Sequence, residues 1–211
     1  MIHLPLTQTQ HPVFPLTRER IAEGLARPAP PPDPRDLHVI ALKEGTRVTE
    51  AAVLVPLVNR AGRVQVLFTQ RTPHLEDHAS QISFPGGRVE ADDTGREETA
   101  LRETEEEIGL ARAKVALLGR LTDYEIPSGF RITPVVGWIE PPFTLKPDPF
   151  EVAEVFEAPL EHFLDDANYL RREYHLRGRH RHYMAVPYEG RYIWGATAGM
   201  LYNLRRLLAG E

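Results

Sequence analysis

The sequence contains no cysteine, and this absence excludes disulfides and thiol chemistry. It contains no apolar run near the roughly 18 residues that a membrane-spanning helix needs. Its first residues, Met1 to Pro5, have neither a basic start nor a continuous apolar segment, so we expect no signal peptide. The net charge is −5, which argues against a general nucleic-acid binder. We therefore expect a cytoplasmic protein that binds neither membranes nor nucleic acid.

The composition is otherwise that of a soluble globular protein. The chain has 211 residues, of which 42% are hydrophobic and 26% charged, enough to bury one substantial core. Thr17 to Arg27 has the pattern of a short amphipathic helix, and the proline-rich stretch Pro28 to Pro34 predicts a stiff, extended connector. We expect residues 1–34 to form this helix and connector, and residues 35–211 to form a single domain.

Within that domain the pattern alternates between strands and helices. Ala51 to Leu57 and Val64 to Phe68 read as strands joined by a hairpin turn at Asn59 to Gly62. Further strands are expected at Val115–Leu118, Arg131–Ile139, Val152–Phe156, Tyr183–Val186 and Tyr192–Trp194, and further helices at Leu160–Asp165 and Thr197–Leu208. The last two strands would form a hairpin around Glu189 and Gly190. This order predicts an α/β (α+β) fold, a mixed sheet sandwiched between helices.

The most informative segment runs from Phe84 to Leu110. Paired glycines indicate a turn, an acidic connector follows, and a helix then carries Glu103, Glu106 and Glu107. The i, i+3, i+4 spacing places these carboxylates on one helix face, where each like-charge pair costs roughly 0.2–0.5 kcal/mol. Such a run is also typical of an ordinary solvated helix face. A hard divalent cation, which prefers oxygen ligands, would explain why the repulsion is tolerated.

Signals at both ends predict where this helix begins and ends. Thr94 followed by Glu97 fits a capping box at the start, and Gly109 suits a left-handed cap at the end, with Leu110 packing behind it. The stripe expected to face the core consists of Ala100, Leu101, Thr104 and Ile108. The acidic face would then be held rigidly beside the glycine turn.

The segment resembles the Nudix box, the signature of enzymes that hydrolyse nucleoside diphosphates linked to another group. The residues that carry the resemblance are the glycine pair, the acidic connector and Arg102-Glu103-Thr104-x-Glu106-Glu107-x-Gly109-Leu110. Asp93 lies six residues after Gly87 but nine before Arg102, one more than usual, and this insertion is a feature of the coenzyme A pyrophosphatase branch. The other stretches similar to that branch are 67–72, 84–87, 127–137, 151–156 and 194–198.

The resemblance implies a metal-dependent mechanism and a set of site residues. Mg²⁺ or Mn²⁺ would be held by Glu103, Glu106, Glu107 and the Gly87 carbonyl, with Glu103 or Glu106 as general base and Arg102 orienting a glutamate. Glu151 or Glu154 could supply a further acid, although each also suits a surface strand end. The substrate-contact candidates are Arg71, Arg88, Phe84 and Gly86; for the two arginines an exposed salt bridge is an equal alternative.

The predicted substrate is a small nucleotide, with coenzyme A or its thioesters preferred. Two positions depart from the branch pattern, because Glu76 stands where an arginine is usual and Ser80 where a glycine is usual. These departures favour an alternative, hydrolysis of ADP-ribose or a related nucleoside diphosphate derivative. A catalytically silent nucleotide sensor is a third reading, but such a protein should have lost a box glutamate and this chain keeps all three.

One dense basic patch spans residues 171–182, with Arg171, Arg172, Arg177, Arg179, His180, Arg181 and His182. It would suit the 3′-phosphate of coenzyme A, but an exposed hairpin with solvated charges is the favoured interpretation. His74 and His78 precede the box and are assigned no role. The sequence does not fix the oligomeric state.

Overall fold

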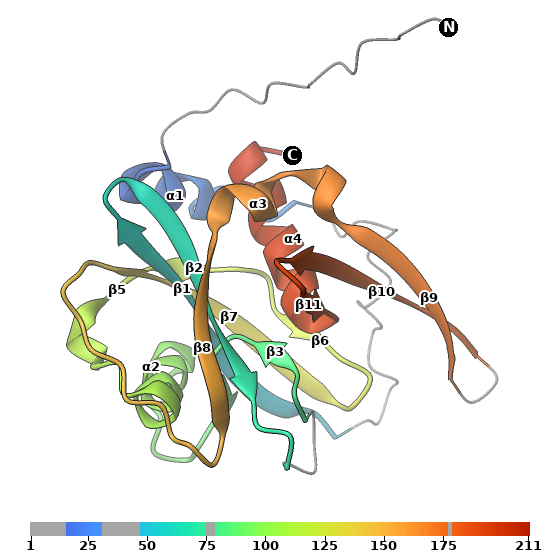
Figure 1. The fold of residues 1–211 in the computed structure, drawn as a ribbon, viewed down its shortest axis with the longest axis horizontal. Helices are drawn as coiled ribbons and strands as arrows, with labels where there is room; N and C mark the ends of the chain where they lie inside the picture. Colours follow the sequence, from blue (N-terminus) through green and yellow to red (C-terminus); the bar gives the residue numbers. More distant parts are fainter. Residues whose placement is uncertain (1–15, 31–46, 75–78, 177–178) are drawn as a thin grey trace, which may run out of the picture.

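The backbone forms a large mixed sheet with helices on both faces and a smaller second sheet beside it (Figure 1). The computed structural model describes residues 16–30, 47–74, 79–176 and 179–211. The helices are α1 (Arg18–Leu25), α2 (Arg96–Ile108), α3 (Leu160–Leu164) and α4 (Ala196–Ala209), with 3₁₀ turns η1 (Arg112–Lys114) and η2 (Asp166–Asn168). The strands are β1 (Thr49–Arg60), β2 (Arg63–Arg71), β3 (Ile82–Ser83), β4 (Gly86–Arg88), β5 (Val115–Arg120), β6 (Tyr124–Glu125), β7 (Phe130–Ile139), β8 (Val152–Pro159), β9 (Leu170–Leu176), β10 (Arg179–Tyr188) and β11 (Arg191–Trp194).

Strand β1 lies at the centre of the large sheet, whose path is β3-β2-β1-β7-β5. It pairs in parallel with β7 and antiparallel with β2 and β4. Its side chains are buried on both faces: Ala52 and Leu54 pack with Ala100 of α2, whereas Val55 and Leu57 join the core under α4. A strand covered on both sides reads as a continuous apolar run, which is how this stretch appears in the sequence. The predicted sandwich of a mixed sheet between helices is confirmed.

The first hairpin forms where the sequence predicts it. Ala61 and Gly62 both adopt positive φ, 51° and 85°, as a two-residue hairpin turn requires. The Asn59 side-chain oxygen accepts a hydrogen bond from the Gly62 amide at 3.0 Å. β1 and β2 extend beyond the predicted strands at both ends, because the ladders with β7 and β8 continue away from the hairpin and Arg60 pairs with Arg63 next to the turn.

The small sheet has the order β11-β10-β9 and rests on α4. Its β10–β11 hairpin turns at Glu189 and Gly190, as predicted, with φ values of 46° and 78°. Met184, Val186 and Ile193 are buried. The basic patch falls on the β9–β10 ladder, which projects from the body at the right of Figure 1. The hairpin interpretation of this segment is confirmed at the level of the backbone.

The N-terminal helix packs onto the same core. Thr17 caps α1 by accepting a hydrogen bond from the Arg20 amide at 3.3 Å. Ile21 is fully buried in the main hydrophobic cluster, and Gly24 lies directly against Leu208 of α4. Of the predicted proline-rich connector, residues 31–34 lie outside the described residues. None of the described helices has the length and apolar character needed to cross a membrane.

Candidate active site

The paired glycines form a strand, which corrects the predicted turn. Residues 86–88 make β4 and pair antiparallel with β1, Gly86 opposite Val53 and Gly87 opposite Ala52. A Cβ at Gly86 would lie 2.4 Å from the Ala52 carbonyl oxygen, so only glycine fits this close approach. The sequence signal for glycine was right, but the reason is packing against β1 rather than chain reversal.

Gly87 lies directly beneath a box glutamate. A Cβ at Gly87 would lie 2.4 Å from Cδ of Glu103 and 2.5 Å from both of its carboxylate oxygens. The Glu103 carboxylate therefore occupies the space that any larger residue would fill. Burial raises its pKa despite the opposing influence of Arg102. The structure thus brings together Gly87 and Glu103, two of the proposed metal ligands.

The box helix begins and ends almost where the sequence predicts, but its start is built differently. Gly95 is the N-cap of α2 and offers no side-chain bond, so the predicted Thr94–Glu97 capping box is wrong. The Thr94 hydroxyl instead donates to Glu98 at 2.7 Å, and Glu97 pairs with Arg120 on β5. These partners take both side chains away from the helix N-terminus.

The end of the box helix matches the prediction. Gly109 adopts φ 68° at the C-cap, its amide donates to the Glu105 carbonyl, and Leu110 is buried behind it. On the core-facing side Ala100, Thr104 and Ile108 are fully buried. Leu101 is only half-buried, which corrects its assignment to the core stripe; Thr99 is buried instead.

Arg102 organises the carboxylates on the outer face of α2. Its Nε and Nη2 donate to the two oxygens of Asp93 at 2.9 and 3.0 Å, and its Nη1 donates to Glu103 and Glu106, both at 2.9 Å. Nη2 also donates to the Arg88 carbonyl at 3.0 Å. The guanidinium keeps the pKa of Asp93 well below its ordinary value. Arg102 thereby joins the connector, β4 and two box glutamates in one network.

Glu107 is the most strongly perturbed acid of the site. Its side chain is buried, and burial raises its pKa to about 8. It accepts a long hydrogen bond of 3.3 Å from the Gly86 amide, and its nearest cation, Arg71, stands 3.8 Å away. The nearby carboxylates of Glu151 and Glu103 raise the pKa further. A buried carboxyl group with so few hydrogen-bond donors and positive charges around it is a candidate ligand for a cation.

The donors present fit a hard divalent ion. Carboxylate oxygens and a main-chain carbonyl are the ligands that Mg²⁺ and Mn²⁺ prefer, and the Gly87 contact keeps one carboxylate against the main chain. Glu106 is 58% exposed, and its ion-pair partner among the described residues is Arg102. Within the described part of the chain, no three acidic or histidine side chains stand close enough to chelate an ion as they are. Arg102, placed between Glu103 and Glu106, holds them in their present positions.

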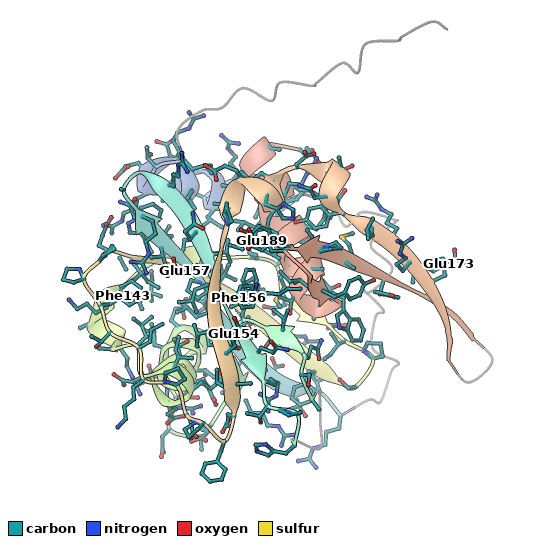
Figure 2. All side chains as sticks on the ribbon, viewed as in Figure 1. Phe143, Glu154, Phe156, Glu157, Glu173 and Glu189 are labelled. Atoms are coloured by element: carbon teal, nitrogen blue, oxygen red, sulfur yellow. The ribbon has the colours of Figure 1, made fainter. Side chains whose placement is uncertain are left out.

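The two candidate acids outside the box lie in different surroundings. Glu151 acts electrostatically on both Glu103 and Glu107, so it belongs to the carboxylate group. Glu154 instead pairs with Arg191 of β11 at 2.5 Å, and that guanidinium also lies over the Phe156 ring at 4.3 Å. Figure 2 shows Glu154 and Phe156 along β8. The structure therefore separates the pair, with Glu151 at the site and Glu154 neutralised elsewhere.

The segment before β8 is tied to the C-terminal end of α2 through the main chain. The Lys146 amide donates to the Ile108 carbonyl at 2.7 Å, and the Asp148 amide to the Glu107 carbonyl at 2.8 Å. The Thr72 amide then binds the Glu151 carbonyl at 3.0 Å. These bonds set the position of Glu151 relative to the box helix.

Of the substrate-contact candidates, one is in the core, two contact Glu107 and one is exposed. Phe84 is 2% exposed and stacks on Phe68 at 5.3 Å, so its assignment to a substrate surface is corrected to a core position. Gly86 uses its amide to bind Glu107. Arg71 faces Glu107, and its buried Nε has no hydrogen-bond partner among the described residues. Arg88 is exposed beside Gly87.

Asp93 and Glu90 are the contributors that the sequence analysis missed. Besides its bonds to Arg102, the Asp93 carboxylate accepts hydrogen bonds from the Glu90 amide at 2.9 Å and the Thr99 hydroxyl at 2.8 Å. Glu90 lies 3.8 Å from Arg102. The acidic connector could have predicted this pairing, because a buried arginine needs a carboxylate partner and the connector supplies acids close to Arg102.

Comparison with known proteins places the chain in a family. The model of the NUDIX domain family matches residues 48–177. A protein of Yersinia enterocolitica named uncharacterized Nudix hydrolase NudL is 41% identical over 155 residues, which cover 73% of this chain and 78% of that protein. The NudL protein of Yersinia pestis is 39% identical over 155 residues, covering 73% and 77%. The chain belongs to the Nudix hydrolase family, whose members hydrolyse nucleotide pyrophosphate bonds and generally use divalent cations.

Solved structures with similar folds include two hydrolases. An Ap4A hydrolase of C. elegans, in a binary complex, is 22% identical with a TM-score of 0.45, covering 54% of this chain and 82% of that chain. The Nudix hydrolase RenU of M. smegmatis is 19% identical with a TM-score of 0.46, covering 54% and 72%.

Proposed function

We propose that this Nudix hydrolase cleaves the pyrophosphate bond of coenzyme A or its thioesters. The products are 4′-phosphopantetheine, or its acyl form, and adenosine 3′,5′-bisphosphate. The observation that carries pyrophosphate chemistry is the buried Glu107 beside Glu103 and the β4 main chain, with Glu151 close by. This group gathers carboxyl groups on one helix, as a site for a cation that bridges to an anionic substrate requires.

The residues have distinct proposed roles in the hydrolysis. Glu103, Glu106, Glu107 and the Gly87 carbonyl would hold Mg²⁺ or Mn²⁺, which neutralises phosphate oxygens and makes bound water more acidic. Glu103 or Glu106 accepts the proton of the attacking water, and Glu151 is the better-placed acid outside the box. Arg102 holds Glu103 and Glu106 in position through its Nη1 group. Arg71 and Arg88 would contact the phosphates.

Coenzyme A is supported by the one-residue insertion in the box connector. Despite this extra residue, Asp93 still reaches Arg102 with both oxygens, so the longer connector is accommodated without loss of the network. Ser80, where the branch usually has glycine, adopts φ 59°. The loop therefore keeps a backbone conformation that suits glycine, and this departure weighs little against the branch. Glu76 lies outside the described residues.

ADP-ribose or a related nucleoside diphosphate derivative remains the second candidate substrate. Glu76 favours it, because a carboxylate replaces a usual arginine where a coenzyme A phosphate could be met. The retained glutamates argue against a silent sensor.

A substrate panel tests the proposal. The purified protein is incubated with Mg²⁺ or Mn²⁺ and coenzyme A, dephospho-coenzyme A or ADP-ribose, and products are identified by mass spectrometry. We expect kcat/KM for coenzyme A to exceed the others by roughly ten- to a hundredfold, since charge-assisted bonds to the 3′-phosphate gain ~1.5–3 kcal/mol. Glu76→Arg should preserve or strengthen this preference. A higher kcat/KM for ADP-ribose or dephospho-coenzyme A would instead indicate a broader hydrolase.

A further inference from the structure

The exposed arginine beside the glycine strand is held by an aromatic ring. The Arg88 guanidinium carbon lies 5.3 Å from the ring centroid of Phe130, the first residue of β7. Among the residues that the structure describes, Arg71, Arg96 and Arg102 each have an acidic partner, but the Arg88 guanidinium has none. Its charge is therefore available to a ligand, and the Phe130 ring lies within cation–π distance of it.

Both members of this pair are fixed at the main chain. Arg88 pairs with Ala51 of β1, and its carbonyl accepts the bond from Arg102. The Phe130 carbonyl accepts from the Ile126 amide at 3.0 Å, and Phe130 stands opposite Thr49 in the β1–β7 register. The next residue, Arg131, is held by Glu125 and Glu50. The main chain that carries the guanidinium and the ring is thus held in place by the sheet.

We propose that Phe130 is a positioning residue that holds the Arg88 guanidinium ready for a substrate phosphate. A guanidinium resting on a ring by its face keeps its in-plane N–H donors free, and these match two phosphate oxygens at once. Because the ring already restricts the Arg88 side chain, that side chain loses less conformational entropy when it binds a phosphate. The Arg88 carbonyl binds Arg102, which also binds Glu103 and Glu106, so the long Arg88 side chain begins next to the carboxylate site. This inference rests on the proposed pyrophosphate hydrolysis and assigns its phosphate-recognition element.

The chain offers a matched control pair far from the box in sequence. Arg60 lies over Phe143 at 5.0 Å, and its guanidinium is already neutralised by Glu157 at 2.6 Å. Phe143→Leu removes the same kind of contact without touching the carboxylates, so it measures the effect of losing an arginine–phenylalanine pair alone.

The test combines ADP titration by calorimetry in Mg²⁺ with kinetics on the best substrate of the panel. We expect Phe130→Leu to weaken ADP binding about two- to fivefold and to raise KM more than it lowers kcat. Phe130→Tyr should restore both values. Arg88→Ala should weaken binding about tenfold, and adding Phe130→Leu to Arg88→Ala should change nothing further. Phe143→Leu should match the wild type, and all variants should melt near the wild-type temperature.

Several results would overturn the inference. In the first, Phe130→Leu binds ADP as tightly as Phe143→Leu does. In the second, Phe130→Leu weakens ADP binding further in the Arg88→Ala background. In the third, the wild type does not bind ADP. Failure of the proposed function is separate, because it shows as no hydrolysis of any nucleotide in the panel. The ADP titrations decide the role of Phe130 in either case.

Discussion

Arg102 and Asp93 form a two-point ion pair in which both carboxylate oxygens meet different nitrogens of one guanidinium, at 2.9 and 3.0 Å. The two side chains are only 13% and 3% exposed. The pair lies between the connector and the acidic face of α2, so it contributes both to stability and to the positions of Glu103 and Glu106.

Asp93→Asn should destabilise the protein strongly. Removing one partner of a buried ion pair leaves the other charge uncompensated, which costs about 3–5 kcal/mol. Because Arg102 depresses the Asp93 pKa, this contribution is present above the ordinary value of 3.8 and is lost as the pH falls through the lower folded value. Urea unfolding at pH 7 and in the acid range measures both effects. Equal stability of variant and wild type at pH 7 would contradict the assignment.

Glu106→Gln and Glu107→Gln should each lower turnover by orders of magnitude while the metal-free protein remains folded. Each change would remove a proposed metal ligand. In the metal-free protein Glu107 is mostly protonated at pH 7, and Glu106→Gln loses both a like-charge contact and its exposed ion pair with Arg102, each worth a few tenths of a kcal/mol, so the metal-free melting temperature should stay close to that of the wild type. Glu105→Gln is the control on the same helix, since Glu105 is exposed and pairs with Arg112. Near-normal turnover in either site variant would refute the metal site.

Metal binding should release protons and strengthen towards alkaline pH. Glu107 has a pKa of about 8 without metal, so it is mostly protonated at pH 7 and must lose its proton to bind a cation. Calorimetric titration of Mg²⁺ or Mn²⁺ at pH 7, in two buffers of different ionisation enthalpy, counts the protons released. Activity should vanish on chelation, return with metal and peak on the alkaline side. Activity that survives exhaustive chelation would exclude this mechanism.

The same pKa shift predicts how metal-free stability varies with pH. A carboxyl group whose folded pKa is raised favours the folded state while it is protonated. Its contribution is therefore complete below the ordinary value of 4.5 and is lost as the pH rises to about 8. Glu107→Gln should flatten this part of the stability curve. Chemical unfolding in the presence of a chelator, at about pH 5 to 8, measures the effect because the raised pKa acts in this range. An unchanged slope in the variant would assign the loss to other groups.

Ser80→Gly should stabilise the protein. Ser80 adopts φ 59°, which costs an L-residue ~1–2 kcal/mol, and glycine avoids this at an entropic cost of ~0.5–1 kcal/mol in the unfolded chain. We expect a net gain of about 0.5–1 kcal/mol in urea unfolding. Ser80→Ala is the control, since it keeps the strain and should gain nothing. A stability ordering in which alanine exceeds glycine would be inconsistent with this backbone.

The sequence was sufficient wherever local spacing decides the structure. The box helix, its Gly109 cap and the hairpin at Ala61 and Gly62 follow from periodicity and turn chemistry over a few residues. The charged face of α2 was predicted because i, i+3, i+4 spacing fixes its direction. β4 was missed, because glycines that allow close packing and glycines that allow a turn look the same in a sequence.

Contacts between distant segments could not be predicted from local patterns. Glu154 and Arg191 are 37 residues apart, and only the placement of β11 near β8 brings them together. The burial of Phe84 against Phe68 likewise depends on how β2 and β3 pair. Thr94 and Glu97 had suitable spacing for a cap, yet Glu98 and Arg120 provided stronger partners.

The main-chain bonds from Lys146 and Asp148 to the end of α2 have a consequence for evolutionary change. They join backbone to backbone, so a substitution of Lys146 need not disturb the spacing between Glu107 and Glu151, whereas Asp148 also accepts a hydrogen bond from the Phe150 amide through its side chain. A change of length there would disturb it, because each added residue shifts every later one. Relatives that preserve this arrangement should therefore keep the number of residues across 146–150 constant and vary more freely at 146 than at 148, and insertions should accumulate earlier in the loop.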